Sequence, residues 1–203
     1  MSSPQDAGER LAAALGLDDL LASADGQGTV CLDVPVERWH DALGWARDEL
    51  GLDFFDWLSA VDEPEVDPAA VDVVVHLACS IPLPDGGVAR LLLRTRVPAD
   101  SATLASVSDL WPGAAWHERE THEMFGLDFS GFQDGTDLGL RPLLLPDGFE
   151  GTPLRKSFVL AARASKPWPG AKEPGESDAG TSPSRRKMLP PGVPDQQWGP
   201  RDE

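Results

Sequence analysis

Two apolar runs joined by a short turn constrain the fold more strongly than any other feature of this sequence. The runs are Val71–Cys79 and Val88–Val97, and between them lies Pro82–Gly87, which reads Pro-Leu-Pro-Asp-Gly-Gly. Proline and glycine at such positions favour a reversal of the chain. Two strands joined by so short a connection pair antiparallel, because a parallel pair needs a long crossover. The sequence therefore predicts a β-hairpin near the middle of the chain.

Helical and strand patterns surround this hairpin. Apolar residues recur at helical spacing in Ala7–Leu21 and Pro35–Leu50, whereas Thr29–Val34 and Asp53–Val61 are rich in β-branched or aromatic residues. A further helix with a serine N-cap is expected over Asp100–Leu110. This order of elements predicts an α+β fold, with the helices packed on one mixed or antiparallel sheet.

The charge balance and the apolar content narrow the class of function. The formal net charge of −17 argues against a nucleic-acid-binding protein, because phosphate backbones require Lys and Arg. The polar first ten residues predict no signal peptide, and no run approaches the roughly 20 apolar residues of a membrane span. Cys31 and Cys79 are expected to be buried, reduced thiols. We therefore expect a cytoplasmic protein.

The composition changes near residue 165. Lys166–Glu203 holds eight of the 19 prolines, with six acidic and six basic residues. We predict a single α+β domain over residues 1–165, followed by a Pro-rich, largely extended or disordered tail over 166–203. A second hypothesis is an arm that becomes ordered on a partner, through its large apolar residues Trp168, Met188, Leu189 and Trp198.

A polar run within Trp116–Phe158 first suggests a metal site. His117, Glu118 and His122 resemble the zinc-binding pattern His-Glu-x-x-His. That pattern places its histidines four residues apart on one helical face, whereas His117 and His122 are five apart. The spacing argues against a metalloenzyme, which is kept as an alternative of a different class.

The same run has two other interpretations. No Gly-x-Ser-x-Gly elbow or Cys/His pair accompanies its carboxylates, so a nucleophilic active site is not indicated. A solvated helix face with an internal Arg119–Glu123 pair is the ordinary explanation of such a run. The third interpretation is a surface that binds another protein.

The residues that follow favour protein binding. Pro142, Pro146 and Pro153 fix φ and remove backbone donors, so an extended path is expected here rather than a strand. Such a segment satisfies its backbone polar groups through side chains or through another chain. The donors Arg141, Arg155 and Lys156 suit either role, since they could bind a partner or the chain's own Glu118–Glu123. We call residues 116–158 the docking segment.

The docking segment carries a family signature. The run from Glu118 to Leu127 reads Glu-Arg-Glu-Thr-His-Glu-Met-Phe-Gly-Leu, and Asp137-Leu138, Arg141, Leu144-Leu145-Pro146 and Gly151-x-Pro-Leu-Arg-Lys follow in order. This signature resembles that of the C subunit of the proton-translocating NADH:quinone oxidoreductase, bacterial complex I. The resemblance implies that the subunit-interface residues include Glu118, Arg119, Glu120, Glu123, Phe125, Gly126, Asp137, Leu138, Arg141, Leu145, Pro146, Gly151, Pro153, Leu154, Arg155 and Lys156.

The resemblance also implies a function and a location. Members of the family are scaffold subunits of the peripheral arm, on the cytoplasmic face of the membrane, and support electron transfer from NADH to quinone coupled to proton translocation. The chain itself is then expected to bind no cofactor and no metal, while neighbouring subunits carry FMN, iron–sulfur clusters and the quinone site. The expected partners are the large quinone-site subunit and the iron–sulfur subunits, rather than a second copy of this chain.

The sequence departs from the family pattern at two histidines. Thr136 and Thr152 stand where the family has histidine, and His122 and Glu123 replace an aromatic residue and an aspartate. These departures suggest a divergent branch, either a paralogue or a subunit of a membrane-bound hydrogenase or another complex with a different electron donor. A free-standing acidic binding module is the remaining alternative outside the family.

Overall fold

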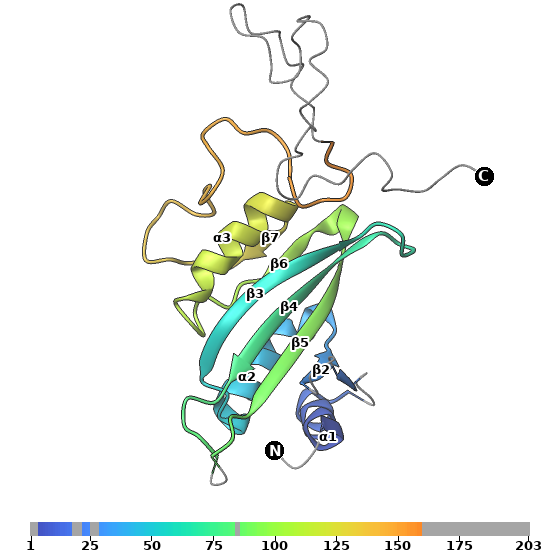
Figure 1. Cartoon of the computed structure of the whole chain (residues 1–203), viewed down its shortest axis with the longest axis vertical. Helices are drawn as coiled ribbons and strands as arrows, with labels where there is room; N and C mark the ends of the chain where they lie inside the picture. Colours follow the sequence, from blue (N-terminus) through green and yellow to red (C-terminus); the bar gives the residue numbers. More distant parts are fainter. Residues whose placement is uncertain (1–3, 18–21, 25–28, 84–85, 160–203) are drawn as a thin grey trace, which may run out of the picture. The chain divides into compact units, whose positions relative to one another are not determined.

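Three long antiparallel strands form the centre of this computed structural model, which describes residues 4–17, 22–24, 29–83 and 86–159 (Figure 1). They are β3 (Phe54–Glu63), β4 (Ala70–Ala78) and β5 (Arg90–Pro98). β4 lies in the middle, with Val75 opposite Leu58 of β3 and Leu93 of β5. The predicted hairpin between β4 and β5 is therefore confirmed.

Two short strands extend the sheet beyond β5. β2 (Val30–Asp33) pairs parallel with β5, and β1 (Ala22–Ala24) pairs antiparallel with β2. The strand order is β1-β2-β5-β4-β3, so the sheet is mixed and the predicted α+β class is confirmed. β1 was not predicted, because its Ala-Ser-Ala sequence carries none of the β-branched or aromatic residues that indicate a strand.

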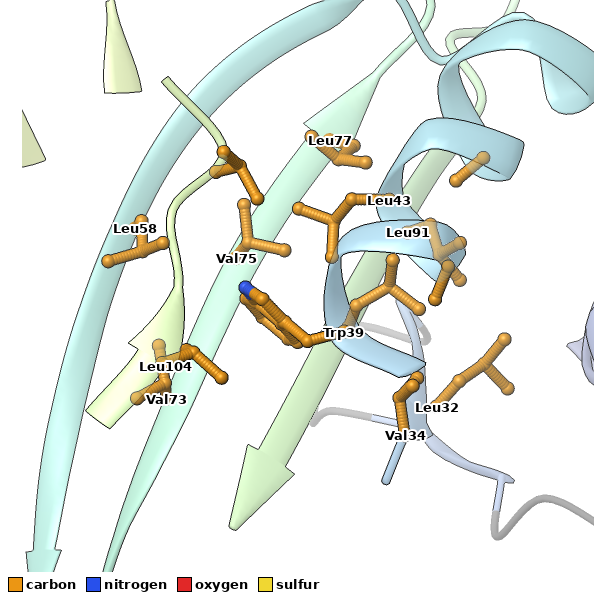
Figure 2. Packing of buried hydrophobic residues seen from close by; sticks show 14 of the residues in the cluster. Leu32, Val34, Trp39, Leu43, Leu58, Val73, Val75, Leu77, Leu91 and Leu104 are labelled. Carbon is orange, nitrogen blue, oxygen red and sulfur yellow. The ribbon is translucent and has the colours of Figure 1, made fainter. Parts of the chain in front are cut away.

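Helix α2 covers one face of this sheet. The short 3₁₀ turn η1 (Val36–Arg38) leads into α2 (Trp39–Leu50), in agreement with the helix predicted over Pro35–Leu50. Trp39 and Leu43 are fully buried and lie against the alternate side chains of β4 and β5 (Figure 2). Burying each large apolar side chain contributes roughly 1.5–3 kcal/mol, so this layer accounts for much of the fold's stability.

The first helix is shorter than predicted. α1 (Pro4–Leu15) buries Leu11 and Leu15, but it stops well before Leu21. Gly16 has φ +66°, a left-handed conformation that glycine adopts without steric cost and that commonly ends a helix. The apolar pattern continued past this point, but the backbone of Gly16 ends the helix there.

The helix predicted over Asp100–Leu110 is wrong. This stretch contains the 3₁₀ turn η2 (Ala99–Ser101), with its serine at the last position, and β6 (Thr103–Ala105), which pairs parallel with β7 (Asp128–Ser130). Side chains of Ser106 and Glu118 bond the backbone of the turn that follows, and such bonds compete with helix formation. Tertiary contacts therefore outweigh the local helical propensity of the alanines and leucines.

The last helix, α3 (Ala114–Phe125), packs beside β3 and ends at Gly126 in the left-handed conformation. From Gly131 to Val159 the described chain has neither helix nor strand, and we call these residues the long loop (orange in Figure 1). The tail predicted over 166–203 lies outside the described residues. No helix in the described part of the chain is long and apolar enough to cross a membrane.

Candidate subunit interface

The polar face of α3 points into the protein rather than into solvent. Glu118, Arg119 and Glu123 are 0%, 7% and 8% exposed, and Thr121 is also buried, whereas Glu120 is exposed. The interpretation of this run as a solvated helix face is therefore wrong. The charged side chains are buried because the turn after β6 and the long loop cover them, a tertiary arrangement that helical periodicity does not reveal.

Arg119 and Glu123 bind the backbone of the long loop. The Arg119 guanidinium donates hydrogen bonds to the carbonyl oxygens of Arg141 and Pro142, at 3.1 and 2.8 Å. The Glu123 carboxylate accepts hydrogen bonds from the N–H groups of residues 143, 144 and 145, at 2.9, 2.7 and 3.2 Å. Two side chains one turn apart on α3 thus bind one backbone polar group from each of five consecutive residues, in a segment that bends at residues 143–145. We call this arrangement the α3 clamp.

The electrostatics of Glu123 agree with this geometry. Burial opposes ionisation of its carboxyl group, but three backbone donors and the nearby Arg119 charge outweigh burial and lower the pKa of Glu123. Hydrogen bonds to an ionised carboxylate are stronger than neutral ones, at about 1.5–3 kcal/mol each. Glu123 therefore holds the loop as a carboxylate at neutral pH.

A second anchor attaches the end of the long loop to β3 and α3. Arg155 donates to the carbonyl oxygen of Phe125 at 2.6 Å and to Oδ1 of Asp62 at 2.9 Å, and the N–H of Lys156 donates to Oδ2 of Asp62 at 2.7 Å. Asp62 is 6% exposed, so its charge is neutralised inside the fold. The sequence left open whether Arg155 binds a partner or Glu118–Glu123, and within the fold its carboxylate partner is Asp62 on β3.

Arg141 forms a separate, local ion pair within the loop. Its guanidinium binds Asp134, which also accepts hydrogen bonds from the hydroxyl and the N–H of Thr136. The Thr136 hydroxyl and Arg141 lower the pKa of Asp134 to about 2. Thr136 therefore stabilises a turn in this chain.

Glycine is required at two of the predicted positions. Gly126 has φ +71°, and a Cβ atom there would lie 3.1 Å from the Thr152 methyl group. Gly151 has φ +99°, and its Cβ would lie 2.9 Å from the Phe158 ring. Both positive φ values and both close approaches exclude larger residues, because side chains are strained in this conformation.

The predicted interface residues fall into three groups. Four are buried side chains of α3, namely Glu118, Arg119, Glu123 and Phe125. Four loop residues are half-buried, namely Arg141, Leu145, Pro153 and Arg155. Eight are exposed, namely Glu120, Gly126, Asp137, Leu138, Pro146, Gly151, Leu154 and Lys156.

Large apolar side chains project from the same region into solvent. Leu138, Leu144 and Leu154 are 69%, 61% and 54% exposed, and Trp116 and Phe149 are also exposed. The predicted site omitted Trp116, Leu144 and Phe149. The signal that could have found them is a set of large apolar residues in a stretch whose prolines and glycines preclude a packed strand. Five large exposed apolar side chains within residues 116–154 favour a protein-binding role for this segment.

The residues proposed for a metal site do not converge. His117 Nδ1 lies 3.2 Å from the carbonyl oxygen of Leu58 on β3, and His122 Nδ1 lies 3.0 Å from that of Leu127. Glu118 faces the turn after β6 instead. Among the residues that the structure describes, no three His, Cys, Asp or Glu side chains are grouped as metal ligands.

Comparison with known proteins identifies relatives of this chain. The NADH-quinone oxidoreductase C subunit of Roseiflexus sp. (strain RS-1) is 37% identical over 156 residues, which cover 76% of this chain and 83% of the relative. The corresponding C subunits of Roseiflexus castenholzii and Thermus thermophilus are 37% and 33% identical, over 75% and 67% of this chain and 82% and 64% of their own lengths.

Solved structures share the fold. The trypsin-resistant fragment of Nqo5 superposes with a TM-score of 0.54 at 27% identity, over 64% of this chain and 98% of the fragment. A chain of the membrane-bound sulfane sulfur reductase, an archaeal respiratory membrane complex, superposes with a TM-score of 0.60. It is 23% identical and covers 77% of this chain and 85% of its own length, so this likeness shows the fold alone.

The family profile described as "Respiratory-chain NADH dehydrogenase, 30 Kd subunit" matches residues 32–164, which include β3, β4, β5, α3 and the long loop. The structure and the relatives agree with this match, and the chain belongs to the family of the 30 kDa subunit of respiratory-chain NADH dehydrogenase.

Proposed function

We propose that this chain is a scaffold subunit, without an active site of its own, in the peripheral arm of an NADH:quinone oxidoreductase. Membership of the family makes the chain a component of this oxidoreductase, and the scaffold role is the finer inference. The FMN, the iron–sulfur clusters and the quinone site belong to neighbouring subunits. The complex attaches to the cytoplasmic face of the membrane, and this chain is peripheral to it.

One observation carries the proposal. The charged groups of α3 are used inside the fold to hold the long loop, and this leaves Leu138, Leu144 and Leu154 projecting outward. A loop held by five hydrogen bonds to Arg119 and Glu123 loses little conformational entropy when a partner binds. Exposed apolar groups on such a preorganised loop suit an interface core, which is depleted of charge.

The partner that fits this surface is the large quinone-site subunit, with the iron–sulfur subunits adjacent. The named relatives are NADH-quinone oxidoreductase subunits, which favours NADH as the electron donor over hydrogen or another donor. Thr136 and Thr152 lie in turns of the loop and do not alter the α3 clamp, so the departures from the family pattern leave the docking role intact.

The test compares two exposed leucine-sized side chains, one in the long loop and one in the β4–β5 connection. Leu144→Asp places a charge in the proposed interface, and Ile81→Asp, at a 78% exposed position in the β4–β5 connection, is the control. Tagged chains are purified from membranes and their partners identified. Leu144→Asp is expected to lose the quinone-site subunit, because burial of an unpaired charge is costly, while Ile81→Asp retains it. Equal retention by both variants contradicts the proposal, and retention of no partner by the unaltered chain favours a free-standing binding module.

A further inference from the structure

Glu118 is the end point of a hydrogen-bond chain that begins in the long loop. Its side chain is 0% exposed. The N–H of Val107 donates to Oε1 at 2.7 Å, and the Ser106 hydroxyl donates to Oε2 at 2.6 Å. Ser106 Oγ lies 2.7 Å from Ser108 Oγ, and Ser108 Oγ accepts a hydrogen bond from the N–H of Gln133 at 3.0 Å. One carboxyl group is thus connected to the start of the loop through two serines.

The donors in this chain all point toward Glu118. The N–H of Gln133 only donates, so Ser108 Oγ accepts from it, and the N–H of Ser108 likewise donates to Ser106 Oγ at 3.2 Å. With Glu118 ionised, the Ser108 hydroxyl donates to Ser106 and the Ser106 hydroxyl donates to the carboxylate. Every proton in the chain then has an acceptor.

Protonation of Glu118 reverses this order. A carboxylic acid with Oε1 occupied by Val107 donates from Oε2 to Ser106, so the Ser106 hydroxyl turns toward Ser108. The Ser108 hydroxyl proton then lacks an acceptor within the described network, although Ser108 is only 4% exposed. An unsatisfied buried donor is costly. Rotation of the Ser108 side chain about χ1 would give its hydroxyl proton a new acceptor, and this rotation moves Oγ away from the N–H of Gln133.

The groups around Glu118 shift its pKa in opposite directions. Burial raises the pKa of Glu118 to about 7, although Ser106 and Val107 favour the ionised form. Two charged groups act on it through space: Asp109, in the turn after β6, raises its pKa, and His40 on α2 lowers it. Those two side chains pair with each other at 2.9 Å, while Arg119 and Glu123 on α3 itself bind the loop backbone.

We propose that protonation of Glu118 releases the attachment of the long loop at Gln133 and thereby weakens binding of the partner as the pH falls below neutral. Release of the loop at Gln133 concerns the isolated chain. Weaker binding of the partner rests on the proposed function, since it takes the long loop to be the docking surface.

The test follows backbone amide NMR signals of the full chain between pH 5.5 and 8.5. The amides of Val107, Ser108 and Gln133 are expected to titrate with one midpoint near 7, and the protection factor of Gln133 against hydrogen exchange is expected to fall about tenfold on protonation, the size of a lost hydrogen bond. Glu118→Gln should abolish the titration. Amides that do not shift, or that shift with unrelated midpoints, overturn the inference.

Two variants keep the test decisive if Glu118→Gln does not fold. Ser108→Ala removes the link but keeps the carboxyl group, so Val107 should still titrate while Gln133 does not; a Gln133 amide that still titrates overturns the inference. His40→Asn removes the nearby imidazole, and the titration of Val107 and Gln133 should persist near neutral pH; its disappearance in this variant overturns the inference.

Partner capture at pH 6 and pH 8 separates the two proposals. Weaker capture at pH 6 that becomes pH-independent in Ser108→Ala supports regulation by Glu118. Capture that is pH-independent in the unaltered chain overturns the regulatory inference and leaves the proposed function standing. Loss of capture at both pH values is instead a failure of the proposed function, and the NMR titration of the isolated chain is unaffected by it.

Discussion

Arg119 and Glu123, one turn apart on α3, bind opposite polar groups of the same backbone segment. The Arg119 guanidinium donates hydrogen bonds to the carbonyl oxygens of residues 141 and 142. The Glu123 carboxylate accepts hydrogen bonds from the N–H groups of residues 143 to 145. Their spacing suggested a surface ion pair between them. Their position beneath the loop makes them a pair of opposite charges that both bind the loop, and this explains why a charged helix face is buried.

The α3 clamp predicts a specific cost for loss of the Glu123 charge. Glu123→Gln replaces one acceptor oxygen by an NH₂ group, which cannot accept from the backbone donors of the loop. We expect unfolding free energy to fall by about 1–3 kcal/mol and the amides of residues 143–145 to exchange faster. Glu120→Gln, at an exposed position on the same helix, should change stability by less than about 0.5 kcal/mol. Equal effects of the two substitutions would contradict the clamp.

The Asp62–Arg155 pair predicts that Arg155 is required for stability before any partner binds. Arg155→Ala leaves Asp62, 6% exposed, without its charge partner, and such losses cost roughly 3–5 kcal/mol. Chemical denaturation of the isolated chain measures this change. Lys156→Ala is the matched control, because its ammonium group is exposed and lies 4.0 Å from Glu63. In the double variant with Asp62→Asn, the two effects should be less than additive.

Glu118 and Glu123 are expected to affect the pH dependence of stability in opposite directions, because the pKa of Glu118 is raised and that of Glu123 is lowered. The pKa of Glu118 is raised to about 7, so the folded state binds a proton more tightly than the unfolded state, and stability decreases as pH rises from about 4.5 to 7. The shift of about 2.5 units corresponds to about 3 kcal/mol. Glu118→Gln should remove this decrease. The same slope in both proteins would mean that another group causes it.

The lowered pKa values of Glu123 and Asp134 act in the other direction. Their contributions to stability are complete above the pKa of each carboxyl group in the unfolded chain, and are lost as pH falls through the pKa in the folded state. Denaturation between pH 2 and 5 should therefore show falling stability with acidification. The fall should be smaller in Glu123→Gln, and an unchanged fall would argue against ionised Glu123 in the folded protein.

The backbone conformation of Gly151 in the long loop is one that favours glycine. Gly151→Ala is expected to destabilise the protein by about 1–3 kcal/mol, because φ is +99° and the new Cβ meets the Phe158 ring at 2.9 Å. Gly113→Ala is the control, since Gly113 has φ −66° and its added Cβ meets open space. Thermal unfolding of both variants checks the prediction, which fails if the two melting temperatures agree.

Local patterns predicted the sheet and failed where distant segments meet. The β4–β5 hairpin followed from two apolar runs and one turn, because both signals lie within 30 residues. The Asp100–Leu110 helix was wrong because β6 pairs with β7, which lies more than 20 residues further along the chain. Helical propensity carries no information about such a pairing.

The candidate site shows the same limit. The family signature identified Arg155 and Glu123 as important residues, but not the groups they bind. Arg155 pairs with Asp62, 93 positions away, and Glu123 binds backbone N–H groups, which every residue except proline carries. Leu144 was missed among the exposed leucines, because apolar character alone does not distinguish a side chain buried in the fold from one exposed at a protein-binding surface.

The most direct test of the docking role is site-specific photo-crosslinking within the assembled complex. A photoreactive residue at position 144, in the proposed interface, is compared with one at position 81, in the β4–β5 connection. The account predicts that position 144 crosslinks to the large quinone-site subunit and position 81 does not. Crosslinking of that subunit from position 81 alone, or from neither position in an intact complex, would contradict it.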